Sequence, residues 1–419
     1  SFNWTPDFTQ AGVYSITFKA TDASLAVDSE VVQITVNNVN RAPVANAGLD
    51  QFNITVGTLV TLDGSGSSDP DLDPLNYSWV QIGGPIVTLT GSTTAFPTFT
   101  PTVPSAYSFE LTVDDGSLFS APDTVVVSTV NGAPPQAVTD LAIVINTGAL
   151  QLSWSPITLD TSGFTTSVAR YVIYRGTSAY FTPTALDSIG VTDSLTTTFT
   201  DNNIGGVTVV GDTTTNYFYV IQVVDIYGNR SALSNRVGEF DYQIVTTATT
   251  DFNLIGIPFT NTGIIDADGL IAAIGAANVN TVNRYVAASQ SFESRFAAGF
   301  GTNFPVTAGG VYQVNAAAAT VFSVAGNVPA PGSISYPIIT TATTDFNFIM
   351  IPFEKESLFS VAQDVLNAMP GVLNTLNNFV AGSQSYESRF AAGFGSNFPV
   401  KAGRPYQANA AAAGTFPGP

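Results

Sequence analysis

The chain has 419 residues, of which only 10% are charged, and its formal net charge at pH 7 is −19. It contains no cysteine and no histidine, which excludes disulfides, Ser-His-Asp and Cys-His catalysis, and the usual zinc sites. The acidic balance disfavours nucleic-acid binding, and no apolar run approaches the length of a membrane-spanning helix.

The composition predicts a folded, modular and exported protein. The length is sufficient for several domains with separate cores, and the hydrophobic content of 45% argues against disorder. A surface with so few charges is typical of secreted chains. Because the chain begins at Ser1 without a methionine or a signal peptide, we expect a mature or partial piece of a longer exported protein.

Residues 1–40 alternate polar and apolar side chains, which predicts a half-buried sheet. The words WTPDFTQAGVYSITFKATD and ITVNNVNRAP resemble the second half of a cadherin-like or Ig-like module. Such a fragment leaves one apolar face open to water, with these members: Ile16, Phe18, Val32 and Ile34. Either the chain is the ordered part of a longer protein, or a strand from a neighbouring copy completes the sheet.

Residues 42–130 contain APVANAGLDQ, VTLDGSGSSDPDLDPLNYSWVQ, FELTVDDGS and DTVVVSTV, and with these words they resemble a polycystic-kidney-disease (PKD) type domain. The resemblance implies a β-sandwich of about seven strands with Trp79 on a central strand. It also implies a spacer or adhesion module without catalysis.

The same segment has the densest group of carboxylates in the chain: Asp63, Asp69, Asp71 and Asp73. Alternate carboxylates on one loop suit calcium, which takes six to eight oxygen ligands. The alternative is a turn in which the aspartates bond their own backbone. Calcium is therefore a possible cofactor here. A second calcium site, at a cadherin-like linker NNVNRAP, is weakened by Arg41.

Residues 133–238 contain LQLSWSPI, RYVIYRG and YFYVIQVVDIYGNRSALSN, and with these words they resemble a fibronectin type III domain. The resemblance implies a second sandwich, with Trp154 in its core and Tyr217 as the tyrosine corner, whose hydroxyl bonds to the backbone of the adjoining loop.

Residues 244–337 and 338–419 are two copies of one block, because Asp251–Ala319 aligns with Asp345–Ala413. Each copy predicts a strand, a short helix (from Asp266 and from Ser357), further strands and a glycine-rich turn. The layout resembles an uncharacterised repeat of exported bacterial surface proteins, which carries no known function. We expect two β-rich α+β domains that pack closely with one another or with other subunits.

Four residues of the repeated words ESRFAAGFG are candidate interface residues: Arg295, Phe300, Arg389 and Phe394. Glu293 and Glu387 could form a glycosidase pair, but each precedes an arginine by two residues, which favours a surface ion pair. The phenylalanines of the turns, with Phe304 and Phe398, could be exposed for sugar stacking or buried in packing.

The sequence predicts a mainly β protein: a string of Ig-like β-sandwiches followed by two tandem α+β domains. We expect no enzyme but an extracellular or cell-surface structural protein that forms a filament, surface layer or adhesive stalk from copies of itself. The alternatives are the spacer or carbohydrate-binding region of a secreted polysaccharide-degrading enzyme, and an adhesin. Cell-surface glycans are then possible partners.

Overall fold

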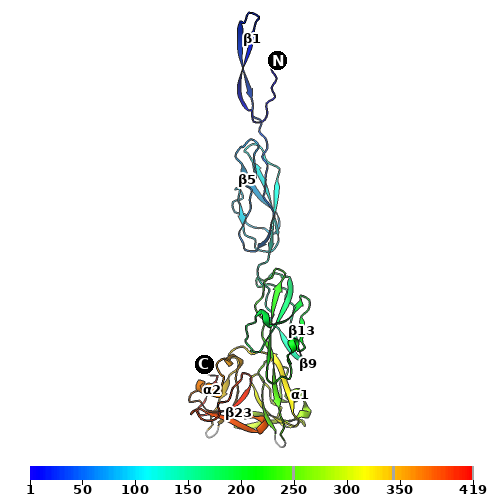
Figure 1. Cartoon of the computed structure of the whole chain (residues 1–419), viewed down its shortest axis with the longest axis vertical. Coiled ribbons are helices and arrows are strands. Elements are labelled where there is room, and N and C mark those ends of the chain that lie inside the picture. Colours follow the sequence, from blue (N-terminus) through cyan, green and yellow to red (C-terminus); the bar gives the residue numbers. More distant parts are fainter. Residues whose placement is uncertain (248–250, 342–344, 418–419) are drawn as a thin grey trace. The chain divides into compact units, whose positions relative to one another are not determined.

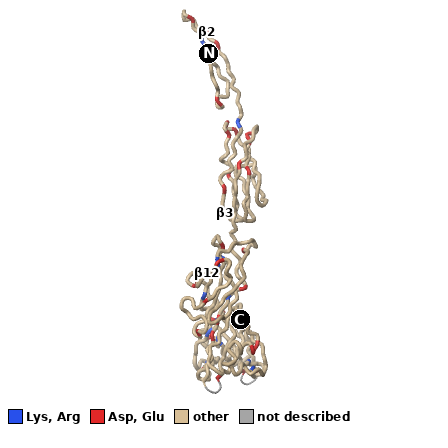
Figure 2. Tube along the Cα trace, turned by 90° about the vertical axis from the view of Figure 1, so that its right-hand side faces the viewer, with Lys and Arg blue, Asp and Glu red and all other residues tan. Residues whose placement is uncertain are grey.

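The computed structural model describes residues 1–247, 251–341 and 345–417; the middle of each TTATTDFN motif and the last two residues lie outside the described residues. The chain is mainly β, as predicted, and forms two compact units, Ser1–Gly132 and Ala133–Pro419. Figure 1 traces the elements in chain order, and Figure 2 shows that Lys and Arg occur at few places along the trace. None of the described helices is long and apolar enough to cross a membrane.

The first module (residues 1–40) is a two-stranded antiparallel hairpin of β1 (Gly12–Thr21) and β2 (Val27–Val36). In its register Ile16 lies opposite Val32 and Tyr14 lies opposite Ile34. Because side chains alternate between the faces of a strand, these residues share one face. The Trp4 ring packs against Tyr14 on this side, with 4.7 Å between ring centroids.

The second module (residues 42–130) is a sandwich of two sheets in the order β3-β8-β7-β5 and β4-β6. Its strands are β3 (Gln51–Thr55), β4 (Val60–Thr61), β5 (Asn76–Gly83), β6 (Thr98–Phe99), β7 (Ala106–Asp114) and β8 (Asp123–Val130). Trp79 is buried, as predicted, but β5 is an edge strand and not a central one. A loop covers that edge, where the Trp79 N–H donates to the carbonyl of Ser92 at 2.9 Å.

The third module (residues 133–238) contains β9 (Ala142–Asn146), β10 (Ala149–Ser153), β11 (Val168–Gly176), β12 (Ser188–Asp193), β13 (Thr198–Asp201) and β14 (Tyr217–Asp225). Trp154 is buried and packs against Tyr171 in its core. The hydroxyl bond expected at Tyr217 is found instead in the first two modules, where Tyr14 and Tyr107 each donate to the backbone four residues upstream.

The third module and the first repeat share a sheet. Strand β15 (Val237–Ile244) pairs with β14 on one side and with β20 (Thr320–Asn327) of the first repeat on the other, in the order β12-β11-β14-β15-β20. The predicted boundary between residues 238 and 244 therefore falls inside one strand.

The two repeats have the same topology. The first contains β16 (Phe252–Gly256), α1 (Ala267–Ile274), β17 (Val279–Val286), β18 (Ser291–Phe296) and β19 (Val311–Ala316), in the sheet order β16-β19-β17-β18. The second contains β22 (Asp345–Met350), α2 (Ala362–Ala368), β23 (Leu373–Val380), β24 (Ser385–Phe390) and β25 (Pro405–Ala410), in the order β22-β25-β23-β24. Strands β21 (Tyr336–Ile338) and β26 (Gly414–Phe416) form a further pair. Figure 1 shows α1 and α2 at opposite sides of the C-terminal unit.

The first helix starts as predicted and the second does not. Asp266 caps α1, since its carboxylate accepts the N–H of Gly269 at 2.8 Å. Helix α2 begins at Ala362, five residues after the predicted Ser357. Asp364 sets this start, because its carboxylate accepts the N–H groups of Ser360 and Val361.

Two carboxylates are buried where the third module meets the first repeat. Glu239 and Asp241 alternate along β15, so they point to the same face, and both are fully buried. Asp241 accepts hydrogen bonds from the N–H of Gly211 at 2.6 Å and from the Ser323 hydroxyl. Among the described residues, neither oxygen of Glu239 has a hydrogen-bond donor. Burial, and then the adjacent Asp241, raise the pKa of Glu239 to about 10.

The first prediction is that Glu239 makes stability depend on pH. Since its pKa is higher in the folded chain than in the unfolded one, the folded state holds an extra proton between pH 5 and 9. The free energy of unfolding should then fall as pH rises, by at most about 1.4 kcal/mol per pH unit. Glu239→Gln, which is neutral at every pH, should flatten this slope and stabilise the protein at pH 9.

Urea unfolding followed between pH 5 and 9 measures the effect, with the exposed Glu387→Gln as the control that should keep the slope of the wild type. Equal slopes for the wild type and Glu239→Gln would show that Glu239 is ionised in the folded protein.

Candidate functional site

The predicted calcium loop is organised around Asp69. This side chain is buried, and its Oδ1 accepts the N–H groups of Asp71 at 2.6 Å and Asp73 at 3.3 Å. Leu72 between them has a left-handed backbone (φ 65°). Asp69 therefore closes the loop through its own backbone, as the alternative interpretation of the sequence expected.

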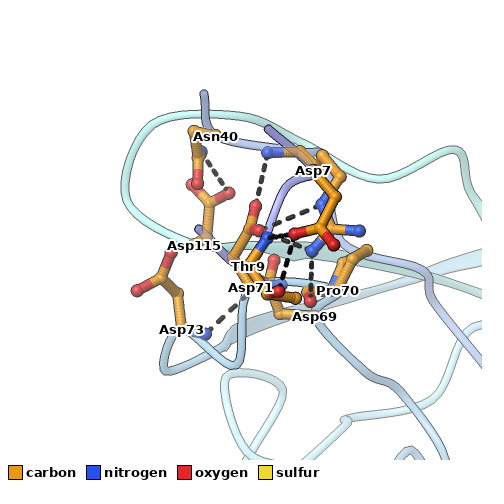
Figure 3. Close-up of polar contacts among 9 residues, drawn as sticks. Asp7, Thr9, Asn40, Asp69, Pro70, Asp71, Asp73 and Asp115 are labelled. Atoms are coloured by element: carbon orange, nitrogen blue, oxygen red, sulfur yellow. Dashed lines mark hydrogen bonds and ion pairs between the residues drawn. The ribbon is translucent and has the colours of Figure 1, made fainter. Parts of the chain in front are cut away.

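Arg41, from the segment that joins the first and second modules, inserts its charge into this loop (Figure 3). Its Nε and Nη2 donate to Oδ1 of Asp71 at 3.0 and 2.6 Å, and its backbone N–H donates to Oδ2 at 2.8 Å. Nη2 also donates to the carbonyl of Pro70 at 2.6 Å. The hydrogen bonds from Arg41 lower the pKa of Asp71, and the guanidinium lies 4.8 Å from the ring centroid of Phe8.

The preceding residue is held from a second loop. Asn40 donates through Nδ2 to Oδ2 of Asp115 at 2.7 Å. The other oxygen of Asp115 accepts the N–H groups of Ser117 and Leu118, at 2.7 and 2.8 Å. Asn40 and Arg41 are thus bonded to two different loops of the second module. The sequence analysis noted Arg41 in the linker but missed its pairing with Asp71.

The four predicted calcium ligands do not converge on one point. Asp63 bonds the N–H and hydroxyl of Ser65, and Asp71 is saturated by Arg41. Of these four, Asp69 keeps a buried oxygen, Oδ2, that has no donor among the described residues. Within residues 1–247, 251–341 and 345–417, no three acidic side chains form a group that could hold a metal ion. This arrangement does not fit calcium, and the guanidinium supplies the positive charge instead.

The two repeats hold each other by reciprocal bonds. Gln384 of the second repeat accepts the N–H of Phe252 at 2.9 Å and donates to its carbonyl at 3.0 Å. Gln290 of the first repeat makes the same pair with Phe346, at 2.8 and 3.2 Å. Both phenylalanines lie on edge strands, β16 and β22. Each glutamine therefore satisfies an edge that would otherwise be open.

The candidate interface arginines of the repeats make contacts within their own copy. Arg295 binds Asp268 of α1 and the carbonyl of Gly301. Arg389 binds Gln363 of α2 and the carbonyl of Gly395. Both arginines fix a helix to a glycine turn.

The glutamates do not pair with these arginines, contrary to the prediction. Glu293 forms its ion pair with Arg284, directly across β17 and β18. Glu387 accepts a hydrogen bond from Asn378 at the equivalent place.

Of the four phenylalanines in the turns, Phe300 and Phe394 are exposed, whereas Phe304 and Phe398 are buried in the core. The sequence could not separate them, because all four stand in the same glycine-rich words. The burial of Phe304 and Phe398 corrects the expectation that they could be exposed.

One family model matches the chain, and it matches the second module. Residues 47–130 match a model whose description is that of a PKD domain. The chain is 38% identical over 132 residues to the human Dyslexia-associated protein KIAA0319, which is 30% of this chain and 12% of that protein. Chitinase A of Pseudoalteromonas piscicida is 38% identical over 96 residues, 22% of this chain and 11% of the enzyme. The chain thus spans about an eighth of the relatives it matches.

A solved structure, the PKD domain from the KIAA 1837 protein, is 30% identical and covers 23% of this chain and 97% of its own length, with a TM-score of 0.20. By the family match, the segment of Asn40 and Arg41 leads directly into a PKD module.

The second prediction concerns Arg41 as the cation of this joint. Arg41→Ala should lower the melting temperature of the N-terminal unit, because Asp69 and Asp71 then lie side by side without a counter-charge. Millimolar calcium should raise the melting temperature of Arg41→Ala and leave the wild type unchanged, since only the variant has free carboxylate oxygens.

Lys19→Ala, which removes an exposed cation from the hairpin, is the control and should behave like the wild type in both conditions. A calcium-induced shift of equal size in the wild type and in Arg41→Ala would mean that calcium binds without displacing the guanidinium.

Proposed function

We propose that this chain is a non-catalytic part of an extracellular surface protein, in which copies join into a filament, surface layer or adhesive stalk. The string of β modules, the match of residues 47–130 to a PKD domain and the low charge support an extracellular structural role. The glutamates that could have formed a glycosidase pair are taken up by Arg284 and Asn378. This supports a role without catalysis.

The observation that carries the proposal is the open face of the β1–β2 hairpin. Phe18 and Val32 are 45% and 38% exposed, and Ile16 and Ile34 beside them are only half-buried. The sheet has two strands, so each has an outer edge. Two strands alone make a marginal sheet in water. A strand from a neighbouring copy would pair with one edge and cover this face.

A second candidate function is a spacer in a secreted polysaccharide-degrading enzyme. The similarity to Chitinase A over 96 residues favours it. A catalytic domain on the same polypeptide would distinguish this candidate, and assembly of the chain into fibres would argue against it.

The third prediction tests assembly through the hairpin face. The wild type should form elongated assemblies in negative-stain images and sediment faster as concentration rises. Phe18→Asp with Val32→Asp should remain single particles, because two charges cannot be buried without partners.

The matched control is Thr17→Asp with Gln33→Asp, which adds the same charge to the opposite face of the same strands and should assemble normally. The proposal fails if the face variant assembles as the wild type does, or if the wild type stays monomeric throughout.

A further inference from the structure

The rings of Phe300 and Phe394 are exposed at equivalent positions of the two repeats, with 56% and 58% of each residue open to water. Each ring stacks on another ring of its own repeat. The centroids of Phe296 and Phe300 are 4.2 Å apart, and those of Phe390 and Phe394 are 4.3 Å apart, with an interplanar angle of 18° in both pairs. Because one face of each outer ring is covered, the opposite face offers a flat apolar surface to solvent.

The turn that carries each outer ring is fixed in place. The N–H of Phe296 donates to the carbonyl of Phe300 at 3.0 Å, and Arg295 Nη1 donates to the carbonyl of Gly301 at 3.0 Å. Gly301 has φ +91°, and a Cβ there would meet the carbonyl oxygen of Ser294. The second repeat makes the same two bonds at the same lengths. Both rings are therefore positioned before any ligand arrives.

The two copies have kept this turn while changing elsewhere. Residues 289–306 and 383–400 are identical at all but two positions, whereas residues 260–286 and 354–380 agree at only four. The copies have thus had time to exchange most of their helical segments. The bonds of the turn are made by backbone groups and Arg295, so they do not require an aromatic ring at Phe300. Retention of an exposed ring in both copies points to a role at the surface.

The surroundings of the rings select the chemical class of the ligand. The next side chains past the glycine, Thr302 and Ser396, are exposed hydroxyls. The guanidinium of Arg295 is already bound to Asp268 and the carbonyl of Gly301. One ring with a neutral rim is far smaller than the roughly 1,000 Å² that a stable protein interface buries. It matches the CH face of a pyranose, whose hydroxyls can bond to the rim.

We propose that the Phe296–Phe300 and Phe390–Phe394 stacks are two binding platforms for a neutral polysaccharide. Each outer ring receives the apolar face of one sugar unit, and the two platforms of one compact unit act together on a repeating polymer. Such bivalency raises the apparent affinity above that of either platform alone. The sites do not depend on how copies of the chain assemble.

The test uses the full chain and three insoluble probes, which are cellulose, chitin and xylan. The wild type should be depleted from solution by at least one of them. Phe300→Ala with Phe394→Ala should lower the bound fraction by about tenfold, and either single variant should fall between, because one platform remains. Phe300→Leu with Phe394→Leu keeps apolar area but removes the ring, and should bind as weakly as the alanine variant.

The control is Ile265→Ala with Leu358→Ala, which removes exposed aliphatic area from both repeats and should bind like the wild type. Unchanged binding by the leucine variant would overturn the proposal, as would a wild type that binds none of the three probes. Association of copies that the alanine variant abolishes, without binding to any probe, would assign the rings to a protein contact instead.

Discussion

Unpaired strand edges are the constraint on which the C-terminal unit depends. An open edge exposes N–H and C=O groups that must find partners. Strand β15 meets this need on both sides, with β14 of the third module and β20 of the first repeat. The edges of β16 and β22 are met by Gln384 and Gln290. Each part of the unit thus supplies bonds that another part lacks, and the buried side chains of both repeats form one continuous core.

Further bonds connect the second repeat to the strand that the other parts share. The Tyr242 hydroxyl on β15 donates to the carbonyl of Gly403 at 2.6 Å. Arg404 donates to the carbonyl of Thr213 in the third module at 3.0 Å and lies 4.8 Å from the ring centroid of Phe240. A rigid body of this kind would hold two surface turns in a fixed relation, which suits repeated recognition of a polymer better than two domains on a flexible linker.

The sequence predicted what alternation and local chemistry determine. The shared face of Ile16 and Phe18, the burial of Trp79 and the cap at Asp266 all follow from residue spacing. It could not predict partners distant along the chain. Glu239 lies opposite Ala325 in the shared sheet, and periodicity shows which face a residue occupies but not which strand pairs with it. For the same reason Arg41 was taken as a residue that weakens a calcium site, whereas its partner Asp71 makes it the cation of the joint.

Native-state hydrogen exchange of the full chain in increasing denaturant tests most directly whether the third module and both repeats fold as one body. We expect the amides of β15, β16 and β22 to become exchangeable in a single opening reaction, with one free energy and one dependence on denaturant. Exchange of the second repeat at lower denaturant, while β15 and β16 stay protected, would contradict a shared body and leave the repeats as independent domains.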